Sequence, residues 1–348
     1  VSLGEYAFNN CSGLAEIIIP DSVTEIGRGT FQNCKILDNV DLNQVATVKS
    51  YAFYGCTALK NLDLRNVRTL ESNAFGNCDT LESVTIPASV TDMGSSGAFA
   101  GCGLLQRVVF SYGIQTIPAN ACRNINCLTT VEFESNGDEN SSVTAIGNHA
   151  FFNCYGLITI DLPDTLSSIG NEAFSGCSSL RDIVLPETVG QIGSRAFANC
   201  NALRIVSLGN QLTADTLNSN AFYRSAQSEL MVQTENTWLR EDYDWSKSNI
   251  TPLYAVKGFE TGENGRVLAF EKGFLAIVGS GAMADYASAD EIPWREYLGD
   301  MRYLFIGSNI THIGAHSFDG SSLSDLWLRD CASLKTIGDF AFANNRHL

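Results

Sequence analysis

Residues 169–193, IGNEAFSGCSSLRDIVLPETVGQIG, contain one complete copy of a pattern that recurs along most of the chain. Its apolar residues fall where a short strand would meet a core, with Asp182 and Val184 on the opposite face of that strand. Pro186 cannot donate a hydrogen bond to a neighbouring strand, so it suits the strand's end. The pattern therefore predicts a buried set made of Ala173, Phe174, Cys177, Leu180, Ile183, Leu185 and Ile192.

The aromatic position of this pattern returns at intervals of 22 to 29 residues, at Phe8, Phe31, Phe53, Phe75, Phe99, Cys122, Phe151, Phe174, Phe197 and Phe222. After a gap of 96 residues it returns at Phe318 and Phe342. A unit of about 23 residues cannot bury its apolar side alone, whereas stacked neighbours supply the missing surface. The spacing predicts a solenoid of the α/β type, mainly β, with about twelve repeats and a non-repeat connector.

These residues resemble the BspA-like class of leucine-rich repeats, whose pattern reads roughly I-G-x-x-A-F-x-x-C-x-x-L-x-x-I-x-L-P-x-x-V. The resemblance covers about 225 consecutive residues and then 301–348. It departs from the pattern where Cys122 replaces the aromatic residue, and where the ladder cysteine is replaced by Ile125, Ser225, Ser321 and Asn345. The resemblance implies a surface protein of a host-associated microbe, linked to adhesion to host proteins and other cells.

The chain divides into four predicted parts: an array over 1–225, a strand-plus-helix cap over 226–252, a β-hairpin connector over 253–300, and a second repeat block over 301–348. An uninterrupted stack with a large side insertion remains the alternative. Both ends of the chain fall inside a repeat, so we expect a piece of a longer protein.

The predicted cap contains a strand at 230–232 and a helix that starts after Asn236. Trp238 and Trp245 stand seven residues apart, which would place them on one face of that helix. In the connector, a hairpin is predicted with arms at 266–271 and 274–279 around the turn Lys272-Gly273.

Charge and motifs exclude several classes of protein. The chain holds 22 Lys and Arg against 38 Asp and Glu, a net charge of −16 that would repel nucleic acid. No run approaches the roughly 18 apolar residues of a membrane span. No Gly-x-Ser-x-Gly elbow occurs, and Gly279-Ser280-Gly281 lacks the context of a dinucleotide loop. We therefore expect no enzyme and no cofactor.

The cysteines do not point to a metal site or to disulfides. One repeat position holds eight of the eleven: Cys11, Cys34, Cys56, Cys78, Cys102, Cys154, Cys177 and Cys200. A ladder of this kind spaces neighbouring Cβ atoms by about 4.8 Å, longer than the ~3.8 Å of a disulfide. Zinc needs ligands that converge, whereas a ladder spreads them along a line. We expect free, buried thiols. His312 and His316 flank a strand-to-turn segment and are poor metal ligands.

The solvent side of the predicted strands carries the candidate contact residues. Three aromatic side chains fall together there, and aromatic residues concentrate binding energy at interfaces. The candidate partner-binding residues are Tyr303, Phe305, Trp327, Val184 and Asp182. Either an external partner or the connector could cover them.

The sequence favours a non-catalytic, secreted or surface-displayed binding protein with a protein partner, which could be a host extracellular or cell-surface protein. One alternative is glycan binding through the connector aromatics Trp238, Trp245, Trp294 and Tyr297, with Trp327. Another is a structural spacer. Any signal peptide or anchor would lie outside this segment.

Overall fold

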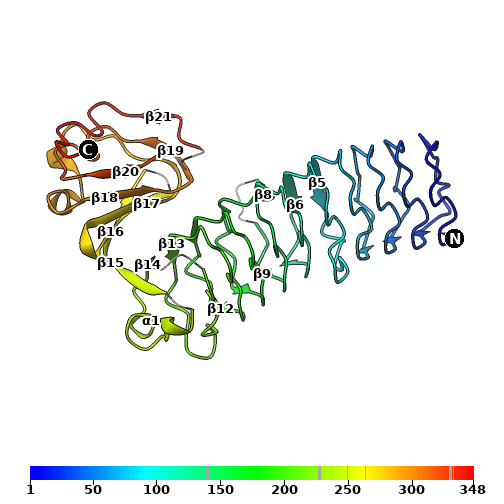
Figure 1. Cartoon of the computed structure of the whole chain (residues 1–348), viewed down its shortest axis with the longest axis horizontal. Helices are drawn as coiled ribbons and strands as arrows, with labels where there is room; N and C mark the ends of the chain where they lie inside the picture. Colours follow the sequence, from blue (N-terminus) through cyan, green and yellow to red (C-terminus); the bar gives the residue numbers. More distant parts are fainter. Residues whose placement is uncertain (138–140, 226–228, 249, 263, 329–330, 332) are drawn as a thin grey trace.

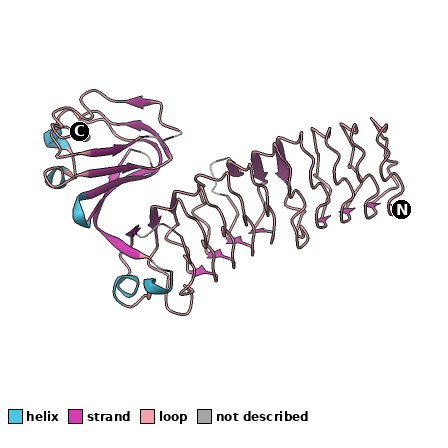
Figure 2. Cartoon of the chain, in the orientation of Figure 1, coloured by secondary structure: helices cyan, strands magenta, loops and turns pink. Residues whose placement is uncertain are grey.

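The structure is a computed structural model that describes residues 1–137, 141–225, 229–248, 250–262, 264–328, 331 and 333–348. The chain forms a mainly-β solenoid of about 14 turns with almost no helix, which confirms the predicted fold class. The coils run in a single line from the N-terminus and then bend, so that the C-terminal part folds back above the line (Figure 1). The short helices gather at this bend and in the C-terminal part (Figure 2).

Two rows of parallel strands line opposite sides of the first array. One row consists of two-residue strands: β1 (Ser2–Leu3), β2 (Glu25–Ile26), β3 (Thr47–Val48), β4 (Thr69–Leu70), β7 (Thr116–Ile117), β9 (Ala145–Ile146), β10 (Ser168–Ile169) and β12 (Gln191–Ile192). The other row has longer strands: β5 (Ser83–Ile86), β6 (Arg107–Phe110), β8 (Thr130–Phe133), β11 (Asp182–Val184), β13 (Ile205–Ser207) and β14 (Glu229–Gln233). We call the solvent side of this second row the open strand face.

The core has the predicted register. Every residue of the predicted buried set of 169–193 is at most 3% exposed. The phenylalanine rings stack from coil to coil, with ring centroids 5.0 to 5.6 Å apart in each stacked pair. Phe110, whose ring lies edge-on to Phe151 at 6.2 Å, supplies an aromatic contact where Cys122 interrupts this ladder. Trp245 continues the first stack beyond Phe222, and Trp294 precedes Phe318 in the second.

The ladder cysteine is a hydrogen-bond donor as well as a small buried group. Its thiol donates to the backbone carbonyl of the aromatic residue one coil earlier, with Sγ–O distances of 3.1 to 3.4 Å at Cys34, Cys56, Cys78, Cys102, Cys177 and Cys200. At two of the positions where cysteine is replaced the same bond persists, because Ser225 donates to Phe197 and Asn345 donates to Phe318. Ser321 instead donates to the side chain of Asn345. The departures at Ser225 and Asn345 therefore keep the chemistry of the repeat.

The cap is built differently from the predicted single helix. Asn236 caps α1 (Thr237–Glu241), and its side chain accepts from the N–H groups of Trp238 and Leu239, as predicted. However, α1 ends at Glu241, and Trp245 lies in a separate 3₁₀ helix, η1 (Trp245–Ser248). The prediction that both tryptophans share one helix face was wrong, because Trp245 instead completes the phenylalanine stack.

Three long strands follow the cap. β15 (Thr251–Thr261) pairs in parallel with β14 and then antiparallel with β16 (Asn264–Phe270), which pairs antiparallel with β17 (Phe274–Ala282). The predicted hairpin is present with longer arms, and its turn η2 (Glu271–Gly273) holds Lys272 and Gly273 at positive φ. The sequence did not predict β15, because it contains a proline and a glycine, which usually argue against a strand.

The repeat pattern resumes directly on this hairpin. After η3 (Ala289–Glu291) and η4 (Arg295–Tyr297), β18 (Tyr303–Ile306) and β19 (Asn309–Ile313) both pair in parallel with β17. β20 (Asp325–Trp327) then pairs with β18, and β21 (Thr336–Ile337) pairs with β19. One sheet therefore runs without a break from β11 through the hairpin to β20.

We expect Phe174→Ala to lower the free energy of unfolding by about 3–5 kcal/mol, because it removes a fully buried ring from the stack. Urea unfolding followed by circular dichroism measures this change. Leu104→Ala is the control, since Leu104 is 46% exposed and its truncation should change stability by less than about 1 kcal/mol. Equal losses in the two variants would contradict the register described above.

Thiol titration tests the cysteine ladder. None of the eleven cysteines, all of which lie in the described residues, forms a disulfide. Burial raises the pKa of Cys56 and of Cys177 to about 12, which keeps both thiols protonated and unreactive. We expect unfolded, unreduced protein to release all eleven thiols to Ellman's reagent, while in native protein the exposed Cys11 reacts first and the ladder reacts slowly. Recovery of one to three thiols after unfolding would instead indicate disulfides.

Candidate functional site

The predicted contact residues lie together, but against other parts of the same chain. Phe305 is 6% exposed and Asp182 is 3% exposed. Val184 and Tyr303 are half-buried, and the ring of Tyr303 stacks on Phe274 at 4.5 Å. The backbone of Trp327 pairs with that of Phe305, as predicted, but the side chain of Trp327 lies outside the described residues.

A curl of the sheet explains this burial. A separate apolar cluster covers the face shared by β13 to β18, and consists of Ile205, Met231, Leu253, Ala255, Leu268, Phe270, Ala276, Val278 and Phe305. The curl brings β17 close to β11, a strand far from it along the sheet. The sequence left open whether the connector or an external partner covers Phe305. The structure shows that residues of the connector and of the first array pack on it.

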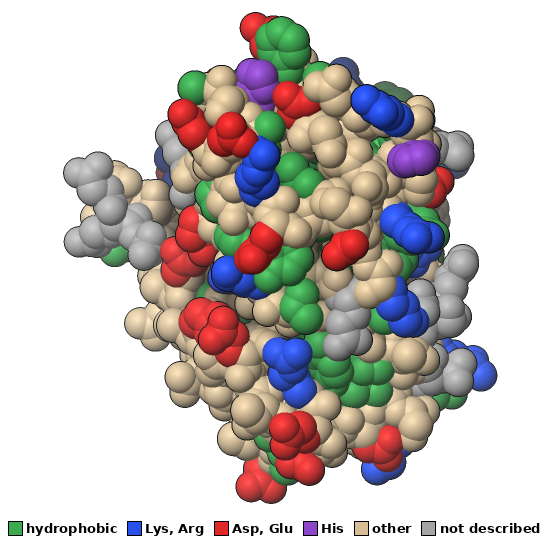
Figure 3. All heavy atoms as spheres, turned by 90° about the vertical axis from the view of Figure 1, so that its left-hand side faces the viewer, with side chains coloured by type: hydrophobic (Ala, Val, Ile, Leu, Met, Phe, Trp, Pro, Cys, Tyr) green, Lys and Arg blue, Asp and Glu red, His purple; other side chains and the backbone are tan. Residues whose placement is uncertain are grey.

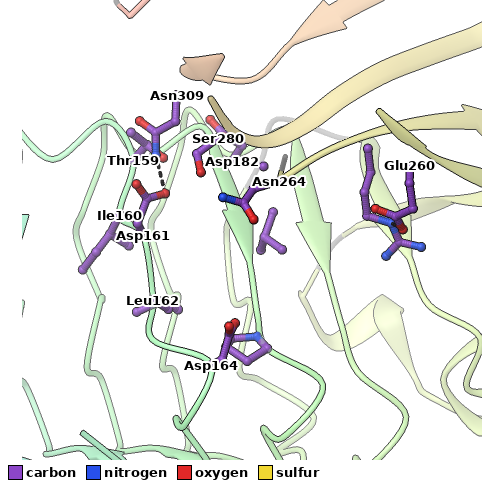
Figure 4. Close-up of a pocket in the computed structure, with 14 residues that line it drawn as sticks. Thr159, Ile160, Asp161, Leu162, Asp164, Asp182, Glu260, Asn264, Ser280 and Asn309 are labelled. Atoms are coloured by element: carbon purple, nitrogen blue, oxygen red, sulfur yellow. Dashed lines mark hydrogen bonds and ion pairs between the residues drawn. The ribbon is translucent and has the colours of Figure 1, made fainter. Parts of the chain in front are cut away.

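Two hydrogen-bonded contacts close the curl. The hydroxyl of Ser308 donates to Oδ1 of Asp182 at 3.0 Å, and the backbone N–H of Ser308 donates to the same oxygen at 3.5 Å. The amide of Asn309 donates to Oδ1 of Asp161 at 2.5 Å (Figure 4). Ser308 lies between β18 and β19, and Asn309 is the first residue of β19. These two hydrogen bonds therefore attach the second repeat block to the open strand face of the first array.

The pKa values of the two carboxyl groups that accept these hydrogen bonds are raised. Burial raises the pKa of Asp182 to about 6, although the hydrogen bonds from Ser308 pull it down, and the nearby charge of Asp161 raises it further. Partial burial also raises the pKa of Asp161, against the lowering effect of the Asn309 hydrogen bond. Removing water from a carboxylate therefore outweighs the hydrogen bonds that it gains here.

Next to these contacts lies a hollow between the first array and the hairpin, with a volume of about 450 Å³ (Figure 4). A second hollow of about 630 Å³ adjoins it and shares Asp161, Leu162 and Asp164. We call the two together the groove. Its carboxylates are Glu132, Asp161, Asp164, Asp182 and Glu260, with apolar surface from Val131, Phe133, Leu162, Pro163, Val184 and Pro186. The groove is therefore acidic with apolar walls.

The basic groups near the groove already have acidic partners. Arg266 Nε lies 2.9 Å from Oε1 of Glu260. Arg107 makes two hydrogen bonds of 2.6 Å to Glu132, and these bonds lower the pKa of that carboxyl. Asp161 and Asp164 form no salt bridge with the described residues. The charge of Arg181 lowers the pKa of Asp182, but by less than burial raises it. At neutral pH the groove offers net negative charge to an incoming molecule.

Beyond the groove, the open strand face of the first array stays accessible. One position per strand and its neighbour two residues on form two rows, in which the exposed residues are Glu16, Ile18, Asn39, Asp41, Asn61, Asp63, Ser83, Thr85, Arg107 and Thr130. Val109, which falls in the second row, is buried instead. The chemistry of these rows changes from coil to coil more than that of the core beneath them. At the opposite end of the molecule, acidic and basic side chains are interspersed (Figure 3).

Two of the four connector aromatics are packed in the core. Trp245 is 5% exposed and Trp294 is fully buried, with its Nε1–H donating to the carbonyl of Ser317 at 2.9 Å. Tyr297 lies edge-on to Phe259. Trp245 and Trp294 cannot belong to the glycan surface that the sequence suggested, because they end the two aromatic stacks inside the core. Tyr297 and Trp238 are both half-buried.

The described residues contain no group of three or more His, Cys, Asp or Glu side chains that could hold a metal ion. His312 is held between Thr336 and Asp285, at 2.7 and 3.0 Å. The backbone N–H of Ala315 and the ring of His312 lower the pKa of Asp285. Among the helices of the described residues, none has the length and apolar character to span a membrane.

Comparison with known proteins identifies the family of the repeat and a solved structure with a similar fold. The BspA type leucine-rich repeat region matches residues 1–96, 37–140, 138–250 and 297–348, in six copies. A leucine-rich repeat protein from Bacteroides ovatus is similar in structure, with a TM-score of 0.50 and 23% identity over 100% of this chain and 81% of that chain. No curated protein matches the chain by sequence.

Two further solved structures match the chain at lower similarity. A leucine-rich cell surface protein from Faecalibacterium prausnitzii has a TM-score of 0.30 and 22% identity, over 74% of this chain and 83% of that chain. The pneumococcal vaccine antigen PcpA has a TM-score of 0.36 and 19% identity, over 72% and 69%. The parallel coils and their ladders define a leucine-rich repeat protein. Within that class, the chain belongs to the BspA-type family.

We expect Asp182→Asn to become more stable relative to the unsubstituted chain as the pH rises from about 4 to about 7. Because folding raises the pKa of Asp182 to about 6, its contribution to stability is fully present below about pH 4 and is lost as pH rises through 6. A shift of about two pKa units corresponds to at most ~3 kcal/mol. Urea unfolding at a series of pH values measures the difference.

Asp38→Asn controls for the loss of one negative charge, since Asp38 is exposed and outside the groove. The difference in free energy of unfolding between Asp182→Asn and the unsubstituted chain should change with pH. A constant difference would contradict the burial of an ionising carboxylate at this contact.

Proposed function

We propose that this chain is a non-catalytic, secreted or surface-displayed protein that binds other proteins through its open strand face. The observation that carries the proposal is the pair of exposed rows, whose residues vary from coil to coil over a repeated apolar core. Such a rigid and variable surface suits recognition of a large partner. The extracellular location rests on the family resemblance, because members of the family are surface proteins of host-associated microbes.

The acidic lining of the groove favours binding of a partner with a basic surface. Its carboxylates outnumber its bases, and the two arginines that border it are already paired. An acidic groove steers basic surfaces toward it and raises the rate of association, an effect that salt weakens. The apolar walls can bury the aliphatic part of a lysine or arginine side chain.

We expect Asp164→Lys to weaken binding to a basic host protein by tenfold or more, because Asp164 belongs to both hollows of the groove. Surface plasmon resonance against purified host matrix proteins, at low and at physiological salt, measures the effect. Asp79→Lys is the matched control, since Asp79 is exposed and outside the groove.

The outcomes separate the candidate functions. Equal affinity in the two variants would remove the groove from the binding surface. If none of the matrix proteins bound the unsubstituted chain, the result would favour the structural spacer over the binding protein.

A further inference from the structure

Trp238 lies at the edge of a hollow that is separate from the groove. Its ring meets Tyr243 edge-on at 5.6 Å and packs partly against the main core, while the rest of the ring stays accessible. The hollow has a volume of about 510 Å³ and lies between α1, β12 and the segment 214–219. In Figure 1, α1 and β12 lie together on the side opposite the second repeat block. We call this space the Trp238 hollow.

Polar side chains without hydrogen-bond partners line the same hollow as the ring. Among the described residues, the side chains of Gln191, Asp215 and Asp242 and the Nε1–H of Trp238 have no hydrogen-bond partner. Asn171 uses only its Oδ1, which accepts from the backbone of Ser194.

A hydrogen bond between two other lining residues, Tyr243 and Asn218, holds part of the wall in place. The Tyr243 hydroxyl donates to the carbonyl of Asn218 at 3.0 Å, which ties the cap to the last coil of the first array. Asn218 also accepts from the N–H of Asn220 through Oδ1, which leaves its amide nitrogen available. The hollow therefore combines a fixed aromatic ring with amide and carboxylate groups free to bind a ligand.

This combination matches the chemistry of a sugar. A pyranose ring has an apolar face of C–H groups that packs on an aromatic ring, and a rim of hydroxyls that both donate and accept. Carboxylate and amide groups can satisfy such hydroxyls in pairs. A concave site with a few convergent polar groups is the usual form of a small-ligand site.

The charges restrict the class of sugar. Asp215, Asp242 and Asp244 line the hollow, no Lys or Arg is among its described lining residues, and Lys247 lies 3.7 Å from Asp244. Negative charge would repel sulfated glycans and those that contain uronic or sialic acid. We propose that the Trp238 hollow binds a neutral oligosaccharide, with one sugar face on the Trp238 ring. This site goes beyond the protein-binding function proposed above and does not rest on it.

Isothermal titration calorimetry with cellotetraose and with the tetramer of N-acetylglucosamine tests the site, and a sulfated heparin tetrasaccharide serves as the anionic probe. We expect saturable binding of at least one neutral probe with a dissociation constant below about 1 mM. The anionic probe should bind at least tenfold more weakly. Failure of both neutral probes to bind, or equal binding of the anionic one, would overturn the proposal.

Variants locate the binding in the hollow. Trp238→Ala should weaken binding at least tenfold, and Gln191→Ala and Asp215→Ala several-fold. Because Trp238 packs partly on the core, its variant is first checked for a native unfolding transition. Gln191 and Asp215 are exposed, so their replacement leaves the fold intact.

Gln211→Ala is the matched control for Gln191→Ala, since Gln211 is also exposed but does not line the hollow. Unchanged affinity in both Gln191→Ala and Asp215→Ala would place the sugar elsewhere and refute this site. Neither result depends on whether the groove binds a protein.

Discussion

Each coil of this solenoid buries its aromatic residue only against the coils before and after it. The stacked rings, and the donor that reaches back to the carbonyl of the preceding aromatic residue, tie every coil to its neighbour. A stack of this kind must be closed wherever the repeat stops. Trp245 closes the first stack and Trp294 opens the second, because a larger ring covers the aromatic face that a missing coil would leave bare.

The solenoid bends because the sheet continues beyond the cap through a hairpin. β15 leaves the cap in parallel with β14, and the hairpin then reverses direction and presents β17 to the second block. Along the open strand face the residues change from polar in the early coils, at Asp41 and Asp63, to apolar near the bend, at Ile205 and Met231. Apolar strands can bury this face by curling the sheet on itself, and polar strands cannot. The change in residue type therefore decides where the face is closed and where it is left for partners.

The result is a molecule with two accessible surfaces of different chemistry. The groove and the exposed rows form a long acidic surface suited to a protein. The Trp238 hollow is small, with an aromatic ring and free amides, and lies where the cap meets the last coil of the first array. Both surfaces depend on the ladders, since the core holds the coils rigid while their outer residues vary.

The sequence by itself determined the coil, the register and the buried set, because a period of about 23 residues admits one way of stacking Phe174 on its neighbours. It also showed the helix cap at Asn236 and the turn at Lys272, which are local features. Only the tertiary structure decided that Phe305 and Asp182 are buried between the first array and the C-terminal part, that Trp245 and Trp294 end the stacks, and that Trp238 is only half-buried. Those outcomes depend on the curl of the sheet, which joins residues more than one hundred positions apart, and no local pattern encodes that contact.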